Sequence, residues 1–219
     1  MKLLRCAVPA FLAFSTSLAI AQTGWSVAVG GGRVMFHSHS NLTIAGSSSP
    51  GASTEPTDGN VAFLIGSYHW SDRWSTRMTF GVPPRTELRA AGTLASLVPP
   101  LTGRMGSVRY APGTLTTDYV FFKHSNFSAY AGGGLNYTKI VSTEDGDVSN
   151  LQVKDAWGAV LGTGIDVQLN KRLSLNMEFK KIYVKVHASG TVAALGNAPV
   201  TATMRLDPTI LFAGLRYRF

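Results

Sequence analysis

Cysteine, acidic side chains and long apolar runs are all scarce in this chain of 219 residues. Its one cysteine, Cys6, excludes an internal disulfide, so stability must come from a large core or a closed hydrogen-bond network. Lys and Arg outnumber Asp and Glu by 20 to 12. After residue 21, no apolar run approaches the roughly 18–20 residues of a membrane-spanning helix. The hydrophobic content is nevertheless 45%, so the apolar residues must lie in short pieces.

The N-terminal segment has the composition of a secretory signal peptide. A short basic start precedes an apolar stretch at 7–20, and small residues occupy the −3 and −1 positions of a cleavage site after Ala21. The apolar stretch is shorter than the ~20 residues of a retained membrane helix. We therefore expect residues 1–21 to be removed and residues 22–219 to form one exported domain.

The rest of the chain alternates with period two. From 156 to 169 the odd positions are mostly bulky and apolar, such as Trp157 and Leu161, whereas the even positions are mostly small or polar, such as Gly158 and Asp166. Such alternation is typical of strands with one apolar face. Eight segments show it: 24–38, 60–71, 74–90, 106–123, 128–143, 153–169, 172–190 and 200–219.

The connections between these segments alternate in length. Short turns are expected at 71–73, 124–127 and 170–171, and long loops at 39–59, 91–105, 144–152 and 191–199. Short turns on one side and long loops on the other are typical of an up-and-down barrel. The pattern predicts an all-β fold, an eight-stranded antiparallel up-and-down transmembrane β-barrel.

A soluble barrel would alternate in the same way, with its apolar side chains inside. Three features favour the membrane. The segments exceed the ~9–11 residues that cross a bilayer, and aromatic residues gather near the short-turn ends as in an interfacial girdle. The last strand, 206–219, ends in the aromatic residues Tyr217 and Phe219. A terminal aromatic residue on the outward face is the usual signal that the barrel-assembly machinery recognises. We therefore predict the cell outer membrane, with membrane lipids as neighbours.

Short motifs, each unspecific by itself, follow one another along the whole predicted barrel. They are Pro112–Leu115, Tyr130–Thr138, Lys154–Gly158, Gly164–Val167, Leu206–Pro208 and Gly214–Phe219. In this order and spacing, the chain resembles the OmpW family, which includes the AlkL-type proteins. The resemblance implies a narrow hydrophobic channel that small apolar molecules enter from outside. Because the periplasmic end is plugged, they would leave sideways into the membrane.

The inward face near the short turns is charged. An eight-stranded barrel is barely wide enough for its own side chains, and charges of both signs confined there must pair. We predict a polar plug on the periplasmic side, whether or not the barrel transports anything. Its residues are Arg77, Asp118, Asp166, Glu178, Arg216 and Arg218.

Toward the long loops the inward face becomes apolar. It can form either a channel lining or a plain hydrophobic core capped by loops. Where the resemblance implies large apolar side chains, Thr79 and Lys180 stand instead, which makes the channel more polar or differently gated. A bulge at Lys180-Lys181 would reverse the parity of its strand. The predicted lining is Phe63, Ile65, Thr79, Ile140, Val160, Lys180, Ile182 and Val184.

Prolines interrupt two neighbouring predicted strands. Pro83, Pro84 and Pro112 lack the N–H that a strand ladder needs, so the wall between them is locally broken. One hypothesis is a lateral opening at this place. The alternative is that the prolines end strand pairing above the bilayer.

The remaining motifs favour neither an enzyme nor a nucleic-acid-binding protein. His37-Ser38-His39-Ser40 has no third ligand or orienting carboxylate at suitable spacing, so we predict no catalytic residue, metal or cofactor. The basic residues Arg85, Arg89, Arg104 and Arg109 are better suited to lipopolysaccharide phosphates than to nucleic acid. A barrel that binds phage, bacteriocin or a host surface without transport, and a lipid-modifying enzyme, remain alternatives. The sequence does not determine the oligomeric state.

Overall fold

The computed structural model describes residues 23–36, 39–44, 46–48, 52–93, 96 and 102–219. The predicted signal peptide lies outside these residues, as do His37 and Ser38. Described residues contain no helix that is long and apolar enough to cross a membrane.

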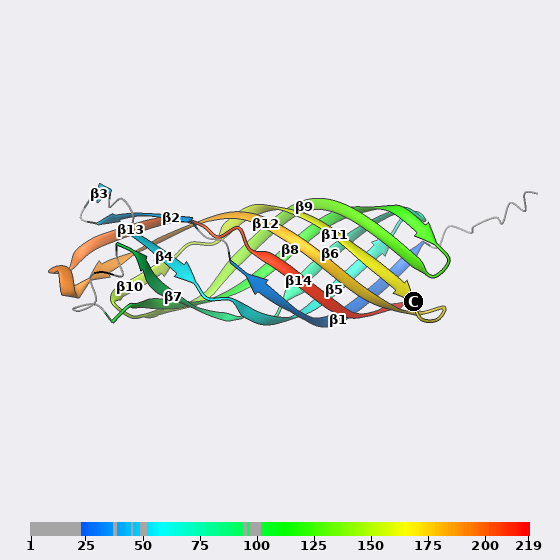
Figure 1. The fold of residues 1–219 in the computed structure, drawn as a ribbon, viewed down its shortest axis with the longest axis horizontal. Coiled ribbons are helices and arrows are strands. Elements are labelled where there is room, and N and C mark those ends of the chain that lie inside the picture. The colour runs from blue at the N-terminus through cyan, green and yellow to red at the C-terminus, as the bar shows by residue number, and fades with distance from the viewer. Residues whose placement is uncertain (1–22, 37–38, 45, 49–51, 94–95, 97–101) are drawn as a thin grey trace, which may run out of the picture.

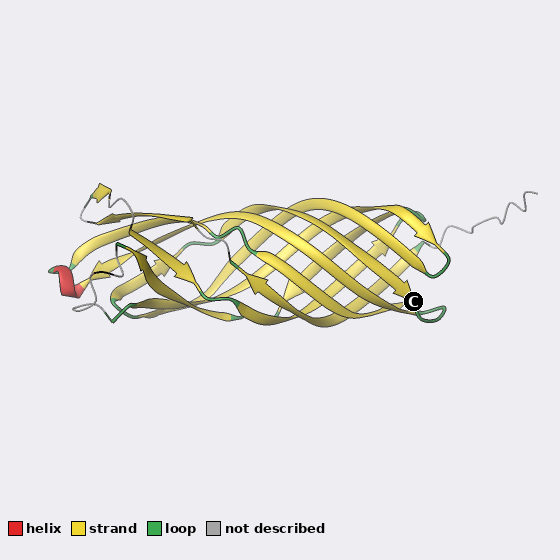
Figure 2. Cartoon of the chain, viewed as in Figure 1, coloured by secondary structure: helices red, strands yellow, loops and turns green. Residues whose placement is uncertain are grey.

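Eight strands form a closed antiparallel ring (Figures 1 and 2). The first and last ring strands pair in register from Ser26↔Arg218 to Met35↔Thr209, which leaves the ring without a free edge. The ring strands are β1 (Gly24–Met35), β5 (Gly59–His69), β6 (Trp74–Gly81), β8 (Arg104–His124), β9 (Phe127–Asp145), β11 (Ala156–Gln168), β12 (Leu173–Val192) and β14 (Thr209–Arg218).

Further strands prolong the wall beyond one end of the ring, where the long connections lie (Figure 1). They pair with one another or with the outer halves of β8 and β12. These elements are β2 (His39–Ile44), β3 (Ser47–Ser48), β4 (Ala52–Pro56), β7 (Arg85–Gly92), β10 (Val148–Val153), β13 (Ala198–Arg205) and the 3₁₀ turn η2 (Ala193–Leu195).

The ring confirms the predicted fold, but two predicted strands and the long loops differ from expectation. The segment 74–90 is divided into β6 and β7 because Pro83 and Pro84 cannot donate to a ladder. The segment 200–219 is divided into β13 and β14 at 206–208, where Asp207 has a positive φ of 33° and Pro208 follows. The predicted loops 39–59 and 144–152 contain strands, because β2 pairs with β13, β4 with β7, and β10 with the outer part of β12.

Bulky apolar side chains lie on the outside of the ring. Leu161 is 57% exposed, whereas its neighbour Val160 is fully buried. In β12 the alternation continues through Lys180, and the β11–β12 register shows no shift there, so no bulge reverses its parity. A continuous apolar outer surface of this kind is suited to lipid.

Aromatic side chains gather on the outside near the short turns. Trp25 packs on Tyr68 with ring centroids 5.1 Å apart, and Trp74 packs on Tyr119 at 4.9 Å. Such a girdle marks the boundary between hydrocarbon and head groups. It places the short turns at one membrane surface.

Candidate transport lumen and its charged plug

The interior near the short turns is closed by an ion-paired cluster around Arg77. This side chain of β6 is 1% exposed, and its Nη1 lies 2.5 Å from Glu178 Oε1 on β12. Its Nε lies 3.1 Å from Asp118 Oδ2 on β8. The guanidinium thus bridges strands on opposite sides of the ring and fills the space between them.

Tyr130 and Asn176 complete the cluster, although neither was among the predicted plug residues. The Arg77 guanidinium lies 3.6 Å from the centroid of the Tyr130 ring, and the Tyr130 hydroxyl donates to Glu178 Oε1 at 2.7 Å. Asn176 Nδ2 donates to the same hydroxyl at 2.9 Å. Both residues have inward parity, which was the signal available in the sequence. Gly164 makes the space, because a Cβ there would collide with the tyrosine hydroxyl.

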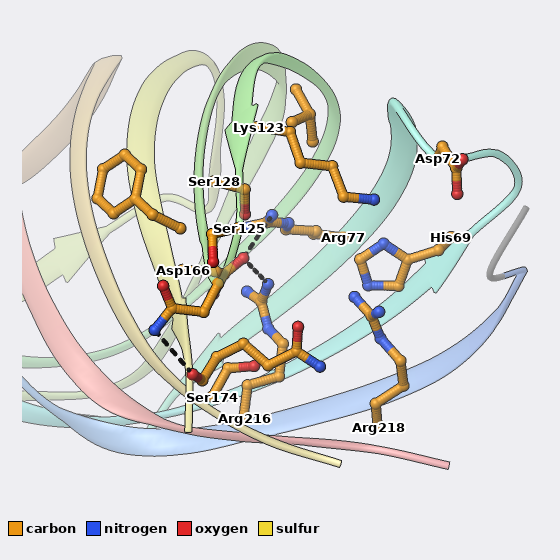
Figure 3. Close-up of a pocket in the computed structure, with 14 residues that line it drawn as sticks. His69, Asp72, Arg77, Lys123, Ser125, Ser128, Asp166, Ser174, Arg216 and Arg218 are labelled. Carbon is orange, nitrogen blue, oxygen red and sulfur yellow. Dashed lines mark hydrogen bonds and ion pairs between the residues drawn. The ribbon is translucent and has the colours of Figure 1, made fainter. Parts of the chain in front are cut away.

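The plug has a second layer toward the short turns. Arg216 Nη1 lies 2.5 Å from Asp166 Oδ2. Below it, a cavity of about 510 Å³ opens at the barrel end, and His69, Lys123 and Arg218 lie around it (Figure 3). The structure therefore places all six predicted plug residues inside the barrel, five in the ion-paired cluster and Arg218 at its mouth.

Lys180 forms the upper edge of the plug. Its Nζ lies 3.0 Å from Glu178 Oε2 and donates to Thr79 Oγ1 at 2.8 Å. Thr79 and Lys180 also line a small cavity of about 20 Å³ together with Phe63, Ile65 and Ile182. The charged floor and the apolar lumen meet at this cavity.

Above this point the interior is apolar. One cavity of about 40 Å³ is lined mainly by apolar side chains, including Ile140 and Val186. A second cavity of similar volume lies next to it toward the outer end, and Leu88 and Met204 line both. Of the other predicted lining residues, Val160 and Val184 are buried in the same core.

The wall beside the lower cavity is interrupted at the prolines. β6 and β8 pair up to Phe80↔Gly113. The next backbone bond across this wall is from Tyr110 N–H to Pro84 O at 3.3 Å, and regular pairing between β7 and β8 begins at Arg85↔Arg109. Pro83 and Pro84 lie in the interruption on one side and Pro112 on the other. Pro112 also lines the lower cavity. The three prolines thus share one place in the wall, at the height where plug and apolar lumen meet.

Charged side chains form a patch on the outer extension of the wall. Arg85 pairs with Glu144, and Arg104 lies between Glu87 and Glu144 at 3.9 and 3.8 Å. All four side chains are 41–52% exposed.

Among the described residues, no group of three or more His, Cys, Asp or Glu side chains could hold a metal ion. The backbone of His39 begins β2, whereas His37 and Ser38 are outside the described ranges.

A closed ring of eight strands with lipid-facing apolar side chains and a filled interior defines the class, a small outer-membrane β-barrel. The OmpW family model matches residues 27–219, and the chain belongs to this family. It resides in the cell outer membrane.

Relatives and solved structures agree with this assignment. The chain is 28% identical over 198 residues to the dibenzothiophene metabolism operon protein PahQ of Pseudomonas aeruginosa, covering 90% of each chain. It is 28% identical to the outer membrane protein AlkL of Ectopseudomonas oleovorans, covering 82% of this chain and 74% of AlkL. The crystal structure of OprG from Pseudomonas aeruginosa has the same fold, with a TM-score of 0.80 at 23% identity, covering 89% of this chain and 95% of OprG.

Proposed function

We propose that this protein is a channel for passive uptake of small apolar molecules, and that it is not an enzyme. The observation that supports this most is the sequence of layers along the barrel. An apolar interior with two small cavities of about 40 Å³ lies toward the outer end, and it is followed by an ion-paired plug beside an interruption of the wall. An apolar molecule that enters from outside would meet charge ahead and a weakened wall at its side.

In this proposal the molecule leaves sideways between β6 and β8, past Pro83, Pro84 and Pro112. Lateral release suits an apolar solute, because transfer into lipid is favourable whereas passage through a layer of paired charges is costly. The relative named for dibenzothiophene metabolism agrees with an apolar, aromatic class of substrate.

The same setting suggests two partners. The exposed Arg85 and Arg104 would bind lipopolysaccharide phosphates, since guanidinium groups hold phosphate through paired hydrogen bonds. The barrel-assembly machinery would recognise the strand β14 before β14 pairs with β1 and β12.

Uptake of ethylbenzene by a deletion strain that re-expresses the protein tests this function. We expect a several-fold higher initial rate than in the strain without it, and no steady ion conductance of the purified protein in a planar bilayer. A Val186→Phe variant fills the cavity of about 40 Å³ that Val186 and Ile140 line, and it should abolish the increase in uptake rate. Val141→Phe makes the same change at a side chain that is 51% exposed on the outside and should preserve it. Equal rates with and without the protein would overturn the proposal.

A further inference from the structure

The small cavity between plug and lumen differs in chemistry from the cavities above it. Its apolar lining includes Phe63, Ile65 and Phe212, but four hydrogen-bonding side chains also border it: Thr79, Thr114, Glu178 and Lys180. A cavity of about 20 Å³ has room for one small group of a larger molecule. What that group can be depends on these polar side chains.

Two of the polar side chains have hydrogen-bonding capacity to spare. Thr114 is 7% exposed, and within the described part of the chain its Oγ1 has no hydrogen-bond partner. The ammonium of Lys180 has three protons, of which one is donated to Thr79 and one faces Glu178. A buried hydroxyl without a partner is costly, so a ligand that supplies an acceptor gains an uncommon advantage here.

The charge balance of the surrounding cluster disfavours an anionic ligand. Arg77, Lys180 and Arg216 carry three positive charges. They face three carboxylates, each with a cation within 4.0 Å: Asp118, Asp166 and Glu178. An added carboxylate would be a buried charge without compensation, whereas a neutral oxygen can accept hydrogen bonds without disturbing the balance.

We propose that this cavity is a selectivity site for neutral oxygenated molecules, in which the oxygen of a ketone or aldehyde accepts hydrogen bonds from Thr114 and Lys180. The apolar body of the molecule lies against Phe63, Ile182 and Pro112, next to the interruption of the wall. This inference rests on the proposed function and names a substrate class for it. The preferred substrates are then oxygen-bearing derivatives of apolar molecules.

Acetophenone and ethylbenzene test the site because they have similar shape and differ in the carbonyl oxygen. Thr114→Val removes the hydroxyl at nearly constant shape, and Lys180→Met removes the ammonium while Arg77 and Tyr130 still contact Glu178. We expect each variant to lower the ratio of acetophenone uptake to ethylbenzene uptake about fivefold, the effect of one hydrogen bond of ~1 kcal/mol. Thr117→Val, at an exposed position of the same strand as Thr114, is the matched control and should change neither rate.

Equal effects on the two solutes, or no effect on either, would overturn the selectivity site while leaving the channel in place. Binding to the purified barrel in lipid nanodiscs separates the site from transport. Acetophenone, and not ethylbenzene, should shift the NMR signals of the Thr114 methyl group and the Lys180 side chain. Absence of that shift would overturn the site even if uptake occurs, and its presence without uptake would overturn the channel alone.

Discussion

At the residue scale, Arg77 shows how a charged interior can be stable in a narrow barrel. Its guanidinium is 1% exposed and contacts Glu178 and Asp118, while the Tyr130 ring covers one of its faces. Desolvating a guanidinium is offset only when such contacts surround it. Removing it would leave the carboxylates buried with fewer partners.

We predict that Arg77→Met lowers the free energy of unfolding by about 3–5 kcal/mol, the usual cost of removing one partner of a buried ion pair. The measurement is urea-induced unfolding of the barrel in lipid vesicles. Arg89→Met is the control, because Arg89 is 65% exposed and its pair with Glu87 contributes at most about 1 kcal/mol. Similar losses in the two variants would show that the plug does not stabilise the barrel.

Asp145 makes a pH-dependent contact at the outer turn between β9 and β10. Its carboxylate accepts the backbone N–H groups of Asn150 at 2.9 Å and Leu151 at 2.9 Å, and these bonds lower the pKa of Asp145. Because the pKa of Asp145 is lower in the folded protein than in the unfolded chain, the two hydrogen bonds stabilise the fold fully above the ordinary Asp pKa. This stabilisation is lost as the pH falls through the lowered pKa.

We therefore expect the amide proton shifts of Asn150 and Leu151 to titrate with a midpoint below the ordinary Asp value. Asp145→Asn should remove this titration and leave the amide shift of Ile140, which donates to Asp155, unchanged. A midpoint at or above the ordinary value would contradict the observed hydrogen bonding.

At the scale of elements, the pairing of β6 and β7 with β8 is interrupted at the prolines. Regular strand pairing stops at Phe80↔Gly113 and resumes at Arg85↔Arg109, with one backbone bond between them from Tyr110 N–H to Pro84 O at 3.3 Å. On the opposite side of β6, the Val82 N–H still donates to Ala62 at 2.9 Å, so the strand remains attached there. The interruption thus separates one pair of neighbours without opening the whole ring.

We predict that Pro112→Ala, alone or with Pro83→Ala and Pro84→Ala, lowers ethylbenzene uptake several-fold, because the restored N–H groups let the ladder close. Pro199→Ala is the control, since Pro199 lies in β13 outside the ring. Initial uptake rates in the deletion strain provide the comparison. Unchanged uptake in the triple variant would mean that the interruption is not an exit.

The elements also show what the sequence could predict. The alternation identified the strands of the ring, and together with the features that favour a membrane it identified the inward position of all six plug residues, because one-sided burial fixes the register of each strand. It missed the strands β2, β4 and β10, since each is only five or six residues long and pairs with the outer extension of another strand. It also missed the contacts of Tyr130, because cross-barrel distances depend on ring closure and not on the local pattern.

At the scale of the whole molecule, the barrel divides into a charged half and an apolar half. Lys180 marks the boundary, in contact with Glu178 below and next to apolar side chains above. Such a division is unsuited to an aqueous pore, because neither half offers a continuous polar path. It suits a solute that enters one half and leaves before the other.

Photolabelling with a small apolar aryl diazirine in outer-membrane vesicles tests this route most directly. Mass spectrometry would identify the labelled side chains, and lipid-facing residues would be labelled in any case. The channel account predicts additional labelling of inward residues that lipid cannot reach, Val108, Val186 and Met204, and none at Ser174 or Gln168 below the plug. Labelling confined to lipid-facing side chains, or extending through the plug to Ser174, would contradict it.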